Sequence, residues 1–255
     1  MWPEPDDASE AVITPARQLA SAHGAPLPPL PETALVFFMG HGVEAAAAQP
    51  GATLITERFP RFLHATPLYR CGGVCVLHGG WGAPMAADTV ETLAATGVRR
   101  VVLAGMCGAF AQGVAPGEVL APPRALVAEG TSPHYAPGAV WSHAAAWLHG
   151  LAAEAFPGAR ALDVVSTDAV YRQTFRQEER WRAQGCAAVD METSAAFTVA
   201  ARVGVEAVAL LMVSDRHPLR PGDAPWAWRM TGELRVDFAR RCLDFAQMVQ
   251  KGAST

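Results

Sequence analysis

The chain has 255 residues, of which 51% are hydrophobic and 17% charged, and its net charge is −4. This composition is typical of a globular protein with one large core or two small ones. The negative charge and the absence of a long basic run argue against a nucleic-acid partner. No apolar run reaches the roughly 20 residues that span a bilayer, which argues against a membrane protein.

Cysteine and lysine content excludes further classes. Five cysteines, an odd number, are scattered through apolar segments: Cys71, Cys75, Cys107, Cys186 and Cys242. With an acidic N-terminal stretch unlike a signal peptide, they predict a reduced, cytoplasmic protein. Cys71 and Cys75 are expected in one strand, and the lack of a second Cys/His pair argues against zinc. Lys251 is the only lysine, so Schiff-base chemistry has almost no candidate.

The first half of the chain contains three glycine-terminated apolar runs. Residues 1–33, rich in Pro and Ala, are expected to form an arm with at most one short helix, followed by a single domain over residues 34–255. "ALVFFMGHG", "VCVLHGGWG" and "RRVVLAGMCGAF" each predict a buried strand that enters a loop. The segment "APMAADTVETLAATG" predicts a helix with Met85, Val90 and Leu93 on one face and Gly97 at its end.

The second half continues the alternation of strands and helices. "GEVLAPPRALVAEG", "ARALDVVSTD" and "AVALLMVSD" predict strands, and "SHAAAWLHGLAAEAF" predicts an amphipathic helix. A final helix is predicted over "ELRVDFARRCLDFAQMVQ", with five residues on its apolar face: Leu234, Phe238, Cys242, Phe245 and Val249. This order predicts an α/β fold, a single domain with a central mixed, largely parallel twisted sheet flanked by helices.

The predicted strands end in glycine or polar residues, and in open α/β sheets ligands bind beyond such carboxyl ends. None of these ends matches G-x-G-x-x-G or the Walker A loop, so a nucleotide-phosphate cradle is not indicated. Asp215 either caps a turn or acts as a general acid with a pKa raised by partial burial, with Arg229 as a tuning partner.

Two acidic residues begin the next predicted helix. Asp190 and Glu192 suit the positive end of a helix dipole. Glu192, however, stands in an almost wholly apolar segment, where a buried carboxylate needs a partner such as a sugar diol. Cys107 is expected in the core rather than as a nucleophile.

The segment "AVDMETSAAFTVAARVGVEAVALLMVSD" resembles the signature of the nucleoside phosphorylase family. That family includes purine nucleoside phosphorylases, uridine phosphorylases and methylthioadenosine/S-adenosylhomocysteine nucleosidases. "GGWGAPMAADTVETLAATGVRRVVLAGMCGAF", "EGTSPHYAP" and "STDAVY" are similar to further segments of the family. "ITPARQLA" resembles the arm that such proteins extend toward a neighbouring subunit. The resemblance covers roughly residues 12–250.

The resemblance implies roles for individual residues. It places the ribose against Met191 and Glu192 and the base against four residues: Cys107, Gly108, Val170 and Tyr171. Asp215 matches the acid that protonates the purine N7, and Arg229 its supporting arginine. The C–N bond then breaks toward an oxocarbenium-like sugar, with no metal and no organic cofactor.

The phosphate site departs from the family pattern. Gly40 is retained, but Glu44 stands where an arginine is expected, and a glutamate there repels a dianion. Leu103 and Met106 replace a second arginine and a hydroxyl group. Arg61 or its neighbour Arg58 is expected to reach the site from an adjacent subunit, and His41 or Arg99 offers a further compensation.

Several functional alternatives stay open. The Gln-x-Arg pair that reads uracil is missing after Tyr171, unless Gln177 or Arg180 fills the role, so a purine is favoured over a pyrimidine. The enzyme is expected to form ribose 1-phosphate with phosphate as co-substrate. A nucleosidase with Glu44 as the base for water and a non-catalytic nucleoside sensor are the alternatives. By resemblance, the chain is expected to form dimers stacked into hexamers and to serve nucleoside salvage or catabolism.

Overall fold

The computed structural model describes residues 9–21, 24, 26–224, 226–228 and 230–252. Its helices are α1 (Pro15–Leu19), α2 (Gly42–Ala47), α3 (Ala83–Ala95), α4 (Ser132–Tyr135), α5 (Ala146–Ala155), α6 (Phe175–Ala183), α7 (Thr193–Val203) and α8 (Gly232–Gly252), with a 3-10 turn at Val170–Arg172. Its strands are β1 (Thr33–Phe38), β2 (Thr53–Phe59), β3 (Thr66–Cys71), β4 (Val74–His78), β5 (Arg100–Ala109), β6 (Val119–Leu120), β7 (Arg124–Ala128), β8 (Trp141–His143), β9 (Val164–Thr167), β10 (Ala188–Asp190), β11 (Glu206–Arg216) and β12 (Ala227–Trp228).

The strands form one mixed sheet with a parallel centre. Its main order is β2-β3-β4-β1-β5-β10-β9-β7-β8, and β11 pairs with β5, β6 and β12. Strands β4, β1, β5 and β11 run parallel, whereas the β2–β3–β4 edge, the β7–β8 edge and the β5–β10 pair are antiparallel. The predicted α/β fold with a mixed sheet flanked by helices is therefore confirmed.

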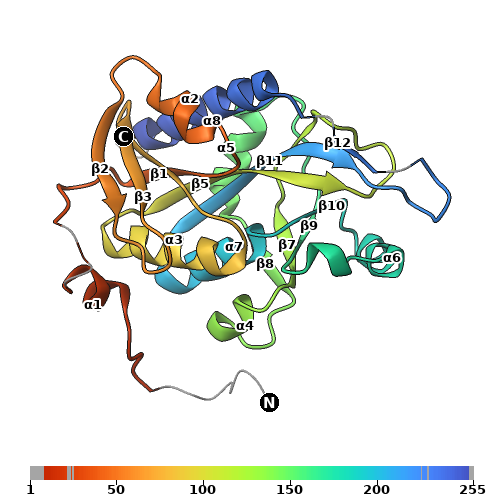
Figure 1. Cartoon of the computed structure of the whole chain (residues 1–255), viewed down its shortest axis with the longest axis horizontal. Coiled ribbons are helices and arrows are strands. Elements are labelled where there is room, and N and C mark those ends of the chain that lie inside the picture. Colours follow the sequence, from red (N-terminus) through yellow and green to blue (C-terminus); the bar gives the residue numbers. More distant parts are fainter. Residues whose placement is uncertain (1–8, 22–23, 25, 225, 229, 253–255) are drawn as a thin grey trace.

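Helices cover both faces of the sheet, as Figure 1 shows, with α2, α5 and α8 on one face and α3 and α7 on the other. Strand β1 is buried along its whole length because both of its faces are covered. Alternate residues of each central strand therefore enter two separate apolar cores, one under α3 and α7 and one under α8.

Most predicted elements are confirmed. Helix α3 ends at Ala95, and Gly97 follows it with a φ of +96°, as predicted. Three other details are wrong. On α8, Leu234 is 43% exposed and does not belong to the buried face. Cys71 and Cys75 lie on two strands, β3 and β4, joined by a tight turn at Gly72. The segment expected as one amphipathic helix begins as strand β8 and becomes helical only at Ala146.

The fold brings the loops that follow β1, β4, β5 and β11 to one end of the sheet, because these strands are parallel neighbours. The amide of Gly79, directly after β4, donates to the carbonyl of Phe37 in β1 at 2.8 Å. Within the described residues, no helix combines the length and the apolarity needed to cross a bilayer.

Candidate active site at the carboxyl end of the sheet

Asp215 lies near the carboxyl end of β11, where a register shift at Ser214 pairs it with Gly108 of β5. Its side chain is 7% exposed. The carboxylate accepts hydrogen bonds from the hydroxyl of Ser214 and, at 2.5 Å, from the indole Nε1 of Trp226. The Nε2 atom of His217 lies 3.2 Å from Oδ2 of the same carboxylate.

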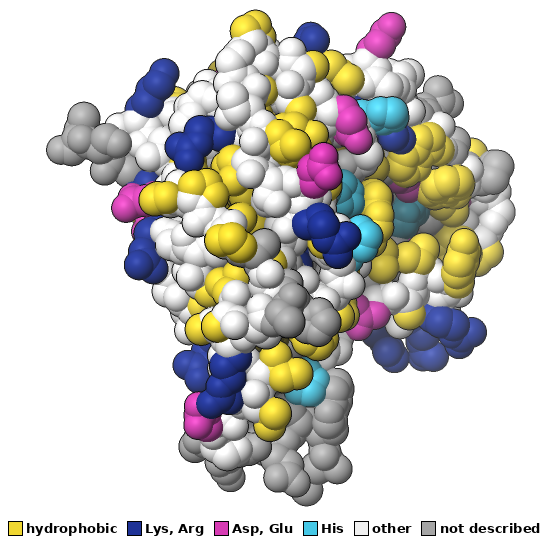
Figure 2. Space-filling model, turned by 60° about the vertical axis from the view of Figure 1, so that its left-hand side comes forward, with side chains coloured by type: hydrophobic (Ala, Val, Ile, Leu, Met, Phe, Trp, Pro, Cys, Tyr) yellow, Lys and Arg dark blue, Asp and Glu magenta, His cyan; other side chains and the backbone are white. Residues whose placement is uncertain are grey.

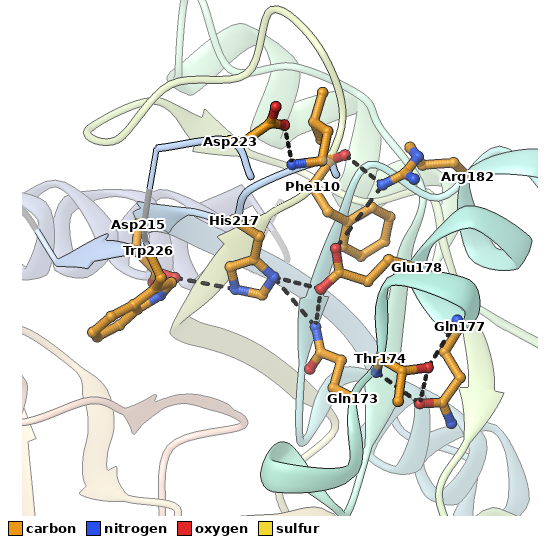
Figure 3. Close-up of polar contacts among 11 residues, drawn as sticks. Phe110, Gln173, Thr174, Gln177, Glu178, Arg182, Asp215, His217, Asp223 and Trp226 are labelled. Carbon is orange, nitrogen blue, oxygen red and sulfur yellow. Dashed lines mark hydrogen bonds and ion pairs between the residues drawn. The ribbon is translucent and has the colours of Figure 1, made fainter. Parts of the chain in front are cut away.

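His217 is held between two carboxylates, as Figure 3 shows. Its Nδ1 atom lies 2.7 Å from Oε1 of Glu178, a buried residue of α6. The side-chain amide of Gln173 donates to the same oxygen at 2.8 Å, and Arg182 approaches the other oxygen of Glu178 at 3.9 Å. The site therefore contains an Asp–His–Glu row that joins β11 to α6.

These contacts decide where the proton resides. Burial alone lowers the pKa of His217, but hydrogen bonds to Asp215 and Glu178 outweigh burial and raise it to about 9. Burial alone raises the pKa of Asp215, but hydrogen bonds from His217, Ser214 and Trp226 lower it below its ordinary value. The expectation that burial raises the pKa of Asp215 is thus wrong, and at neutral pH the proton lies on His217.

Gly108 lies directly beside this pair. A β-carbon at residue 108 would lie 2.4 Å from Nε2 of His217 and 3.2 Å from Oδ2 of Asp215, so no other residue fits without displacing the histidine. The neighbouring Cys107 packs its side chain into the core, and burial raises the pKa of its thiol well above the ordinary value. A thiol so hard to ionise is a poor nucleophile, as the sequence predicts.

A cavity of about 740 Å³ opens next to His217. It is lined by Val170, Tyr171, Gln173, Thr174, Phe175, Glu178, His217, Pro218 and Trp226. The cavity includes both residues that were expected to form the wall of the base site, Val170 and Tyr171. Gln177 instead caps α6 through Thr174, and Arg180 is exposed, so Gln173 is the glutamine that lines this cavity.

Glu192 lies just beyond the end of β10, the strand that pairs with β5. It stands immediately before α7 and is 7% exposed, yet its carboxylate does not cap its own helix. Instead, Oε1 accepts the amide of Gly82 at 2.7 Å, from the loop between β4 and α3, and Oε2 accepts the amide of Met191 at 3.3 Å. Burial and then the charge of Asp190 raise the pKa of Glu192 to about 8.

Asp190 makes different hydrogen bonds from Glu192. Its carboxylate accepts the hydroxyl of Ser166 at 2.5 Å, the amide of Thr193 at 3.0 Å and the hydroxyl of Thr193. Burial raises the pKa of Asp190 despite these donors. Of the two acids at the start of α7, Asp190 therefore fixes the helix to β9, and Glu192 bridges the helix to the β4 loop.

The loop after β1 contains the positions expected to bind phosphate or water. Gly40 is followed by His41, a non-glycine residue with a φ of 69°, and Glu44 is exposed on α2. Leu103 belongs to the core and cannot reach a ligand. Met106, three residues further along β5, is half-buried.

Of the arginines considered for this loop, Arg61 is 3% exposed within its own chain. It donates to the carbonyl of His64 at 2.8 Å and to the hydroxyl of Thr89 at 2.6 Å. Burial lowers the pKa of Arg61 to about 10, against the nearby charge of Asp88. Arg58 is exposed, and Arg99 precedes β5 at the opposite end of the sheet.

Sequence reasoning missed His217, Glu178, Gln173 and Trp226, and it assigned the support of Asp215 to Arg229, which lies outside the described residues. A signal for His217 was available, because residues two apart in an extended segment point to the same side. Glu178 had no such signal, since α6 is polar along most of its length.

Comparisons with known proteins agree on one protein family. A model of the Phosphorylase superfamily matches residues 32–249. The guanosine phosphorylase of Halorubrum lacusprofundi is 30% identical over 138 residues, which are 52% of this chain and 57% of that protein. The chain therefore matches less than two thirds of the length of this relative.

Two solved structures share the fold. The AMP nucleosidase from Bacteroides thetaiotaomicron superposes with a TM-score of 0.71 at 22% identity, over 89% of this chain and 91% of that one. The purine nucleoside phosphorylase from Toxoplasma gondii, in complex with immucillin-H, superposes with a TM-score of 0.73 at 18% identity, over 88% and 92% of the two chains.

Proposed function

Because the chain belongs to the phosphorylase superfamily, we propose that it is a nucleoside phosphorylase, a pentosyltransferase that converts a purine nucleoside and phosphate into free base and ribose 1-phosphate. The observation that carries this proposal is the Asp215–His217 pair beside Gly108, with the carboxylate of Glu192 at a neighbouring strand end. The Asp215–His217 pair can supply a proton to a leaving base, and the carboxylate of Glu192 can accept hydrogen bonds from the hydroxyls of a sugar.

A purine is favoured as the base. The name of the Halorubrum relative supports this choice, as does the presence of an acid group on the base side of the site. The residues proposed to border the base are Cys107, through its backbone, Gly108, Val170 and Tyr171. The residues proposed to border the ribose are Met191 and Glu192.

The proposed chemistry needs a proton at the leaving group. When the C–N bond breaks, its electron pair moves into the purine, and protonation at N7 makes the base a better leaving group. His217 holds that proton against Oδ2 of Asp215, so the proton can move from His217 to the carboxylate of Asp215 and from there to N7 as the C–N bond breaks. Glu178 stabilises the charged imidazole from the other side. Phosphate is the co-substrate, and the scheme uses no metal or organic cofactor.

The fall in kcat/KM at alkaline pH, the alkaline limb of the pH–rate profile, should reflect deprotonation of His217. Because its raised pKa of about 9 means that the protonated form is lost above that pH, we expect kcat/KM to fall about tenfold per pH unit there. Glu178→Gln removes one of the carboxylates that raise the pKa, so the limb should move to lower pH. The measurement is a pH–rate profile of base release between pH 6 and 10.5.

Glu179→Gln is the matched control, since Glu179 is the next residue of α6 and is exposed. Its profile should overlie that of the unchanged protein. If Glu178→Gln left the alkaline limb in place, His217 would not be the group that supplies the proton.

Product analysis tests the reaction itself. The protein is incubated with inosine, adenosine, guanosine, uridine, methylthioadenosine or AMP, with and without phosphate. We expect ribose 1-phosphate from a purine nucleoside only when phosphate is present. Free ribose at equal rates in both buffers would instead identify a nucleosidase, and nucleoside binding without release of any base would identify a sensor.

Hydrolysis is the second candidate, because helix α2, directly after the β1 loop, presents Glu44 where a phosphate site would carry a cation. The exposed Glu44 would then act as the base that activates water, whereas the buried Leu103 offers no polar group. The same product analysis separates this candidate from phosphorolysis.

We further propose that the chain works as a homo-oligomer built from dimers, up to a hexamer, in cytoplasmic nucleoside salvage. Figure 2 shows hydrophobic side chains spread over one face around a hollow that contains histidines. Phe62, Leu63 and Trp81 are each more than half exposed. The amides of Phe62 and Leu63 donate to Asp88 of α3, and Trp81 lies two residues before the same helix. Exposed apolar groups of this kind favour association. Light scattering that gave the mass of one chain would contradict the oligomer.

A further inference from the structure

Arg235 of α8 borders the loop after β1. Its NH1 atom lies 3.9 Å from the position that a β-carbon on Gly40 would take. Apart from the chain neighbours of Gly40, no other atom of the described residues lies within 4 Å of that position. The space beside Gly40 is therefore open and bounded on this side by a guanidinium group.

The guanidinium of Arg235 has unused hydrogen-bonding capacity. Its Nε atom is buried and has no hydrogen-bond partner among the described residues. The group stacks over the ring of Trp228, with 5.5 Å from Cζ to the ring centroid. The atom that faces Gly40 is NH1 rather than Nε, so an anion beside Gly40 would be bound through the NH1 side of the guanidinium. Stacking on the indole restricts the guanidinium while leaving its edge available.

The position suits the attacking group of the reaction. In the proposed reaction the leaving base lies beside Asp215, at the end of β11. Strand β5 separates β11 from β1. Glu192 marks the sugar through its bond to Gly82, and the β4 loop is joined to β1 by the Gly79–Phe37 hydrogen bond. In a displacement at the sugar carbon, the nucleophile approaches from the side opposite the leaving group. The Gly40 loop follows β1, and β5 separates it from the Asp215 end of β11.

The β11–β12 pair connects Asp215 to the residue on which Arg235 stacks. Trp228, which carries the stacked guanidinium, pairs with Asp215 across the β11–β12 ladder. Glu44 brings a negative charge to the neighbouring helix α2, and α2 packs against α8. A cation on α8 would offset the negative charge of Glu44 and thereby favour binding of a dianion.

We propose that Arg235 binds the phosphate co-substrate at the Gly40 loop, in place of a cation on the loops themselves. This assignment rests on the proposed phosphorolysis and names the group that makes it feasible. An anion held at Gly40 by the planar guanidinium would present one oxygen to the sugar.

The test is a comparison of Arg235→Gln, Arg235→Lys and the unchanged protein in steady-state assays with varied phosphate. We expect Arg235→Gln to raise the KM for inorganic phosphate roughly 10- to 100-fold, as the loss of a charge-assisted hydrogen bond predicts. The KM for the nucleoside should change less than about threefold, and Arg235→Lys should recover part of the loss. Arg240→Gln, an exposed arginine of the same helix, is the control.

The outcomes separate this assignment from the proposed function. If the unchanged protein depends on phosphate but Arg235→Gln behaves like Arg240→Gln, the assignment is wrong and phosphorolysis stands. If the unchanged protein releases base equally with and without phosphate, phosphorolysis fails and the assignment fails with it. Melting temperatures of the variants, with and without phosphate, add an independent readout, since phosphate should stabilise the unchanged protein more than Arg235→Gln.

Discussion

Asp215→Asn should lower kcat/KM for a purine nucleoside by about 10²- to 10⁴-fold, the range that a positioned acid contributes. The amide cannot relay a proton between His217 and the base, and His217 loses one of the two carboxylates that hold its charge. The alkaline limb of the pH profile should therefore move to lower pH in whatever activity is left. The measurement is steady-state release of base together with its pH dependence.

A second substrate separates chemistry from structure. 4-Nitrophenyl riboside has a leaving group that needs no proton, so Asp215→Asn should leave its cleavage nearly unchanged. Asp237→Asn, an exposed aspartate of α8, should behave like the unchanged protein with both substrates. An equal loss with both substrates would mean that Asp215 supports the local structure through Ser214 and Trp226 rather than the departure of the base.

Glu192→Gln is expected to lower kcat/KM by about 10²- to 10³-fold at a pH above 8, where Glu192 is ionised, because it replaces a buried carboxylate that would accept hydrogen bonds from two sugar hydroxyls. The amide is nearly the same size and keeps one oxygen for Gly82, so the link between the β4 loop and α7 should survive. The measurement is kcat/KM for inosine, with thermal unfolding as a check on folding.

The contribution of the sugar hydroxyls is isolated with 2′-deoxyinosine. This substrate lacks one of the two groups, so Glu192→Gln should cost it several-fold less than it costs inosine. Glu154→Gln, an exposed glutamate of α5, serves as the control. A loss of the same size for both substrates would show that Glu192 does not bind the 2′-hydroxyl.

The structure assigns different tasks to two acids that look alike in the sequence. Asp190 and Glu192 are two residues apart and both buried, yet Asp190 takes three donors from Ser166 and Thr193, whereas Glu192 takes only two backbone amides. A carboxylate has about four acceptor positions. Glu192 therefore keeps more capacity for a ligand, and Asp190 uses most of its capacity to hold α7.

The sequence by itself determined the α/β class, the order of its main strands and helices, and the end of the sheet where the candidate site lies. Apolar runs that stop at Gly40, Gly79 or Asp215 identify buried strands entering ligand-facing loops. These features depend on local periodicity and on short segments, which a single sequence records directly. The roles of Glu192 and Asp215 came from a resemblance over one such segment and stay proposals.

Only the tertiary structure decided the chemistry around Asp215. The expected rise in its pKa followed from burial alone, but His217 reverses the direction, and its partner Glu178 arrives from a polar helix 39 residues earlier. Arg235 reaches Gly40 across 195 residues of chain, from a helix whose predicted apolar face wrongly included Leu234. Burial, charge pairing and contacts between distant segments depend on how the helices pack on the sheet, and no local pattern encodes them.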